Sequence, residues 1–172
     1  MRKNNPRHRL AIIGGLSLLL LCSAASVAQD LPTEDGSRFF RVMPGQEQWV
    51  DYKGDGAKFG VKEAFILGDP NKPGLYVIRI KFPPGVMSTP HAHPEMRVGF
   101  VIKGTWWTGT GEKFDLNSTT PVPAGGMMVH PAGKYHYDGA RNEETIVQMI
   151  GVGPSGKKTV DPGQPGFIRV PH

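Results

Sequence analysis

From about residue 30 onward, the chain consists of short hydrophobic runs, several of them alternating with polar residues, and none has helical periodicity. Alternation with a period of two is typical of strands that bury one face. The predicted strands cover residues 38–43, 49–52, 59–67, 75–82, 96–102, 105–109, 126–130, 144–152 and 167–170. Clusters of glycine and proline, such as 68–71 and 83–85, separate the runs as turns would. This pattern of about eight to ten short strands without helices predicts an all-β sandwich or barrel.

Three details refine this expected architecture. Lys103 and Gly104 lie between two predicted strands, so we expect a hairpin that pairs 96–102 with 105–109. Trp106 and Trp107 are consecutive, and on a strand they point to opposite faces, one inside the barrel and one on a second surface. The tail 154–172 is rich in proline and glycine and is expected to form a lid or a wrapping segment.

The first 28 residues have the pattern of a secretory leader. Four basic residues precede the apolar run 10–21, and small residues at 26–28 suit a cleavage site before Gln29. The run is shorter than the roughly 20 residues that span a bilayer. We therefore expect an exported protein, periplasmic or extracellular and not held in a membrane after cleavage, with an uncleaved anchor as the alternative. A flexible lead-in at 29–37 and one β-barrel domain at 38–172 should follow the leader.

Removing this leader changes the charge and cysteine arguments. The chain has 20 Lys and Arg against 15 Asp and Glu, and four of the bases precede residue 29, which leaves 16 against 15. A nearly neutral domain gives no support for a nucleic-acid partner. The single cysteine, Cys22, also lies in the leader, so disulfides are not expected to stabilise the domain.

Five of the six histidines follow the leader, and two of them form the sequence His91-Ala92-His93. In an extended segment, residues two apart project to the same face, about 6.5 Å apart, so both imidazoles can approach one metal ion. His136 follows the tight turn 131–133 and is the best candidate for a third ligand from another strand. His130 is expected to have a structural role or to support a ligand rather than to bind metal itself.

These residues resemble the two motifs of the cupin family. The first motif is Gly, five residues, His-x-His, three or four residues, Glu, six residues and Gly, which corresponds to Gly85, His91, His93, position 97 and Gly104. The second motif is Gly, five residues, Pro-x-Gly, two residues, His, three residues and Asn, which corresponds to Gly125, Pro131, Gly133 and His136. The resemblance implies a double-stranded β-helix (jelly-roll) barrel that binds a divalent transition metal such as zinc, iron, manganese or nickel. It also implies a small-molecule ligand and a homodimer.

Two positions depart from the motifs, because Arg97 replaces the metal-binding Glu and Ala140 replaces the terminal Asn. Arginine keeps its charge and cannot ligate a metal. Three alternatives for the metal site remain open. The metal can be held by three histidines plus water, as in catalytic zinc sites, or by the same histidines with the Glu95 carboxylate. In the third alternative, Arg97 binds a substrate carboxylate beside the metal. A fourth alternative is that no metal binds. Arg97 can also be purely structural, paired with Glu95 or Glu112.

The fold does not select a reaction. Metal-binding cupins include dioxygenases, isomerases, lyases and oxalate-degrading enzymes, and other members are binders or sensors without catalytic activity. The first hypothesis is a metal-dependent enzyme in which Arg97 orients an acidic group of a small organic molecule. The alternatives are a non-catalytic protein that binds a metal or small ligand, and a barrel that has lost its metal. Three histidines alone lack the 2-His-1-carboxylate set of many iron oxygenases.

Overall fold

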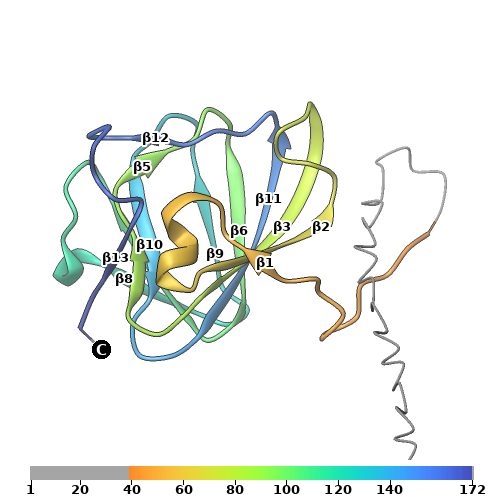
Figure 1. Ribbon diagram of the computed structural model, residues 1–172, viewed down its shortest axis with the longest axis horizontal. Coiled ribbons are helices and arrows are strands. Elements are labelled where there is room, and N and C mark those ends of the chain that lie inside the picture. The colour runs from red at the N-terminus through yellow and green to blue at the C-terminus, as the bar shows by residue number, and fades with distance from the viewer. Residues whose placement is uncertain (1–38, 172) are drawn as a thin grey trace, which may run out of the picture.

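The computed structural model describes residues 39–171, which form two antiparallel β-sheets packed face to face (Figure 1). The first sheet has the strand order β1 (Val50–Asp51), β2 (Lys62–Leu67), β3 (Gly74–Phe82), β11 (Thr145–Gly153), β6 (Arg97–Lys103) and β9 (Met127–His130). The second has the order β12 (Lys158–Thr159), β5 (His91–Ala92), β10 (His136–Ala140), β4 (Val86–Ser88) and β13 (Phe167–Arg169). In this second sheet β7 (Thr105–Thr110) also pairs with β10, and β8 (Thr120–Pro123) pairs with β7. The all-β, double-sheet prediction is confirmed.

The core lies between the two sheets and follows the alternation of the sequence. On β3, Tyr76, Ile78 and Ile80 point inward, and β11 places Val147 and Met149 beside them in the same layer. These strands are the central pair of the first sheet, so their inward faces supply much of the apolar surface whose burial drives folding. The described residues also contain two short 3-10 helices that the pattern did not predict, η1 (Gly54–Phe59) and η2 (Leu116–Ser118).

The predicted hairpin between 96–102 and 105–109 is wrong, because β6 and β7 belong to different sheets. Gly104 makes the corner with φ of +74°, and a Cβ there would lie 2.5 Å from the Glu144 carbonyl oxygen. The packing of Trp106 explains why the chain passes from one sheet to the other at this point. Trp106 is 1% exposed and its ring packs from the second sheet onto Gly99 of the first, where a Cβ would come within 2.7 Å of it.

The strand predicted at 38–43 is also wrong over the residues that the structure describes. Residues 39–43 contain no strand, and the backbone NH of Gln46 donates to the Met43 carbonyl in a turn. Phe39 is 98% exposed, so this apolar segment has no sheet face to cover. The sequence pattern also failed to predict five short strands that the structure contains, β4, β5, β8, β10 and β12.

The tail wraps over one end of the barrel, as expected. β12 pairs with β5, β13 pairs with β4, and the predicted strand at 167–170 is confirmed by β13. The predicted leader at 1–28 and the lead-in at 29–37 lie outside the described residues. Within residues 39–171, no helix has the length and apolar character needed to cross a membrane.

Candidate metal centre

Three histidines meet inside the barrel at the end covered by the tail. His91 on β5 and His136 on β10 are directly opposite each other in the second sheet, and His93 follows β5. Their ring centroids are 4.9 Å apart for His91 and His93, 4.5 Å for His91 and His136, and 5.5 Å for His93 and His136. All three are buried, and one ring nitrogen of each lies within 4.8 Å of the others. The expected convergence of these residues is therefore present.

Backbone carbonyls fix the orientation of all three rings. Each histidine uses Nδ1 to bond a carbonyl oxygen, and the acceptors for His91, His93 and His136 are Thr89 (2.7 Å), Gly156 (2.5 Å) and Lys134 (3.1 Å). A carbonyl can only accept, so Nδ1 carries the proton and Nε2 keeps its lone pair in the neutral ring. This arrangement is the usual one for imidazoles that bind a metal through Nε2.

Burial keeps these rings neutral. Desolvation, aided by the Arg97 guanidinium, lowers the pKa of His93 to about 2, and desolvation also lowers the pKa values of His91 and His136. Metal ligation requires neutral imidazole, so protons do not compete at neutral pH. The Nε2 atoms of His93 and His136 are buried without a hydrogen-bond partner. Three neutral imidazoles with lone pairs turned toward a common point fit a divalent transition metal.

Arg97 lies in the barrel interior at the start of β6. It is 7% exposed, and its Cα is opposite His130 on the neighbouring strand β9. Among residues 39–171, no carboxylate lies within 4.0 Å of its guanidinium, so the ion pair considered with Glu95 or Glu112 is absent. Its Nε is buried without a hydrogen-bond partner. A buried charge of this kind normally has a partner, which makes Arg97 a candidate anion ligand.

Glu95 fastens the tail to the barrel. Its Oε1 accepts hydrogen bonds from the Tyr76 hydroxyl (2.7 Å) and the Ser155 hydroxyl (2.5 Å), whereas its Oε2 is buried without a partner. Gly151 makes this possible, because a Cβ there would lie 2.5 Å from the Tyr76 hydroxyl oxygen. Glu95 belongs to neither group of clustered ligand atoms in the described residues. Its role as a metal ligand stays a prediction, and this geometry gives it no support.

A second cluster of ligand atoms joins His130, His136 and Asp138. The Asp138 Oδ2 lies 3.9 Å from His130 Nε2 and 3.8 Å from His136 Nε2, and the His130 and His136 ring centroids are 3.7 Å apart. From the sequence, a structural or supporting role for His130 is favoured over metal binding, and Asp138 is not among the expected site residues. The sequence does indicate that Asp138 lies near His136, because the two residues are two apart on one strand, the same spacing as in His91-Ala92-His93.

The two tryptophans point in opposite directions, as predicted. Trp106 faces inward, with its ring centroid 5.4 Å from that of His130. Trp107 is half-buried on the other face, where the Arg141 guanidinium stacks 4.4 Å from the ring centroid. The inner tryptophan therefore forms part of the wall around the histidines.

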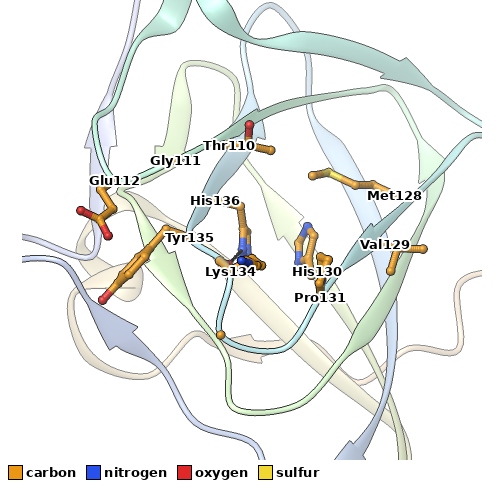
Figure 2. A pocket seen from close by; sticks show the side chains of 11 residues that line it. Thr110, Gly111, Glu112, Met128, Val129, His130, Pro131, Lys134, Tyr135 and His136 are labelled. Carbon is orange, nitrogen blue, oxygen red and sulfur yellow. Dashed lines mark hydrogen bonds between the residues drawn. The ribbon is translucent and has the colours of Figure 1, made fainter.

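A cavity of about 650 Å³ opens next to the second cluster (Figure 2). It is lined by residues 110–112, 128–131 and 133–136, from β7, β9, β10 and the turn before β10. Figure 2 shows the His130 and His136 rings side by side, with Met128 on one side and Tyr135 on the other. A volume of this size admits a small organic molecule. The lining combines apolar contacts with two histidine side chains that could hold a metal ion.

Comparison with known proteins agrees with the fold described above. The family model described as Cupin matches residues 66–168. No curated protein matches the chain.

Among solved structures, the polyketide cyclase RemF from Streptomyces resistomycificus has a TM-score of 0.62 at 15% identity, covering 74% of this chain and 89% of the cyclase. The DMSP lyase DddQ from Ruegeria pomeroyi has a TM-score of 0.56 at 18% identity, covering 69% of this chain and 64% of the lyase. The chain thus spans less than two thirds of that lyase. At these identities the likeness establishes the fold, and with the family model it shows that the chain belongs to the cupin family.

Proposed function

We propose that this protein binds one divalent transition metal ion through His91, His93 and His136 and acts on a small organic acid beside it. The observation that carries the proposal is the set of three buried, neutral imidazoles with Nδ1 bonded to carbonyls and Nε2 directed to a common region. Imidazole ligands suit zinc, iron and nickel, and manganese is acceptable with added oxygen ligands. A bound ion would act as a Lewis acid on a substrate oxygen or on water.

Arg97 supports the choice of an acidic ligand. Arg97 is buried near the histidines, and its guanidinium has no carboxylate partner in the described part of the chain. Arginine binds carboxylates through two parallel hydrogen bonds. An anion bound there would also separate two positive charges, the guanidinium and the metal. The role of Arg97 is to bind and orient the acid, while the enclosing barrel excludes bulk water.

The cavity beside His136 supports entry of the molecule from the side of β7, β9 and β10. Met128 and Tyr135 provide apolar contact there, and His130 and His136 provide the polar side of the lining. The lyase and the cyclase compared above share the fold only, so the reaction type is not taken from them. Binding without catalysis remains the alternative, and turnover of a bound acid separates the two.

Metal affinity provides the first test. Replacing His91 and His93 together by Ala should weaken binding of Zn²⁺ at least about 100-fold in a chelator competition assay, because two of three ligands are removed. Equal affinity in the double variant and in the wild type would contradict the three-histidine site.

Anion binding provides the second test. Calorimetric titration of the metal-loaded protein with a panel of small carboxylates and their neutral amides should give binding of acids only. Arg97→Met should lose at least about tenfold in affinity, whereas Arg141→Met, which removes a guanidinium stacked on Trp107, should not. Equal loss in both variants would contradict a specific role for Arg97.

Export is part of the proposal and rests on the pattern of residues 1–28 alone. It is tested by sequencing the N-terminus of the protein recovered from each cell fraction. A mature protein outside the cytoplasm that begins at Gln29 would support export, and an intact chain in the cytoplasm would contradict it.

A further inference from the structure

Two buried side chains next to the three-histidine set, His130 and Asp138, are not ligands in the proposed site. His130 is 1% exposed, and neither of its ring nitrogens has a hydrogen-bond partner in the described residues. Asp138 is also buried, and its carboxylate faces both His130 and His136. Buried polar atoms are nearly always paired in folded proteins, so an unpaired buried histidine next to a carboxylate marks a place for a missing partner.

The spacing of these atoms identifies the kind of partner. The distances of 3.9 Å and 3.8 Å from Asp138 Oδ2 to the Nε2 atoms of His130 and His136 exceed the hydrogen-bonding range. A bridging water with tetrahedral angles would hold its two neighbours about 4.6 Å apart. A metal ion at about 2.1 Å from each ligand holds them between about 3 and 4.2 Å apart. The observed separations therefore match a metal ion better than a water molecule.

The fold brings the three residues together from two strands. His136 and Asp138 are two apart on β10 and point into the barrel together. His130 is the last residue of β9, and its Cα lies opposite that of Arg97 on β6. Opposed residues on neighbouring strands have Cβ atoms about 5 Å apart. His130 therefore stands beside the position where the first cupin motif has its Glu and this chain has Arg97.

We propose that His130, His136 and Asp138 form a second cation position, a 2-His-1-carboxylate set that adjoins the three-histidine set and shares His136 with it. The motif residues of this chain do not supply two histidines and a carboxylate, because Arg97 replaces the Glu. In the folded chain, His130 on β9 and the pair His136 and Asp138 on β10 would supply them. This inference rests on the proposed function, because both positions depend on a divalent ion entering the barrel. The chemical class it takes is a divalent ion that accepts mixed nitrogen and oxygen ligands, such as Fe²⁺, Mn²⁺ or Co²⁺.

Sharing His136 makes the two positions mutually exclusive. The Nδ1 of His136 donates to the Lys134 carbonyl, so only Nε2 is free to bind an ion. The protein therefore binds one ion in total, either among three imidazoles or between two imidazoles and a carboxylate. An ion in the second position would also have the Asp138 carboxylate as a negative ligand, which the three-histidine position lacks.

Cobalt provides the test, because its visible absorption reports the ligand set directly. The full-length protein and the variant His91→Ala/His93→Ala are titrated with Co²⁺ by absorption and by calorimetry. The expected result is about one equivalent in each, with a changed absorption spectrum in the variant, because its ion is confined to the second position. Adding Asp138→Asn to this variant should weaken Co²⁺ binding at least about tenfold. The matched control is Asp161→Asn, since Asp161 is exposed in the tail, and it should leave binding unchanged.

The outcomes separate this inference from the proposed function. If the wild type binds Co²⁺ and the His91→Ala/His93→Ala variant does not, the second position is rejected while the three-histidine site stands. Two equivalents in the wild type would reject the sharing of His136. A wild type that binds neither Co²⁺ nor Zn²⁺, Mn²⁺, Fe²⁺ or Ni²⁺ would reject the proposed function as well. If Asp138→Asn does not fold, His130→Gln tests the same position from β9, with circular dichroism as the folding control.

Discussion

Arg97 should lower the stability of the protein when metal and ligand are absent. The whole residue is 7% exposed, its Nε is buried without a hydrogen-bond partner, and no carboxylate lies within 4.0 Å of its guanidinium among residues 39–171. Replacing a buried ion pair by apolar residues of similar size is often neutral or stabilises a protein by about 1–4 kcal/mol, and removing a buried charge that lacks a partner should act in the same direction. Methionine has nearly the length of the arginine stem and no charge. Arg97→Met should therefore raise the free energy of unfolding by about 1–4 kcal/mol, which is about 4–16 °C in Tm for a domain of this size.

The assay is urea and thermal unfolding of protein treated with a chelator, followed by circular dichroism. Arg79→Met is the matched control, because Arg79 is also largely buried but is paired with Glu47 and donates from Nε to the Gln148 side chain at 3.0 Å. That variant should lose about 2–4 kcal/mol, since it leaves its partners unsatisfied. If Arg97→Met is destabilised to the same degree as Arg79→Met, Arg97 is structurally paired and the argument for an anion partner is refuted.

Three further predictions concern other parts of the molecule. Gly104→Ala should lower the free energy of unfolding by about 1–3 kcal/mol in urea, because φ is positive there and a Cβ would contact the Glu144 carbonyl. An unchanged free energy of unfolding would contradict the role of Gly104 as the corner between the two sheets. Burial raises the pKa of Glu63 above its ordinary value, so ionisation opposes folding above that pKa, and Glu63→Gln should be more stable than the wild type at pH 7. This advantage should shrink as the pH falls through the raised pKa and disappear below the unfolded value of 4.5, as followed by melts at several pH values. Phe100, on the exposed apolar face of β6 beside β9, should be part of the expected homodimer contact; Phe100→Asp should then give a monomer by light scattering, and an unchanged mass would exclude this face.

The fold was predictable where local alternation and burial agree. Tyr76, Ile78 and Ile80 alternate with more polar neighbours, and β3 buries them as the pattern indicates. The hairpin prediction failed at Gly104 because a two-residue connection can join strands within one sheet or cross between sheets. Only the packing of Trp106 on Gly99, which depends on the other sheet, decides between them.

The sequence predicted those residues of the candidate site that belong to the two linear motifs. The spacing of His91, His93 and His136 was sufficient to anticipate their convergence. The contact between His130 and Asp138 was missed because it joins two strands in different sheets, β9 and β10, although the two-residue spacing of His136 and Asp138 indicates that these two share one face. The lack of a carboxylate partner for Arg97 is likewise visible only in three dimensions.

The measurement that tests the central claim most directly is elemental analysis of the untagged protein, purified without chelators. The account predicts about one equivalent of a single divalent transition metal, reduced at least tenfold in His136→Ala, because His136 belongs to both ligand sets. A wild-type protein that carries no metal, and that takes up none when zinc, iron, manganese or nickel is added, would contradict the account.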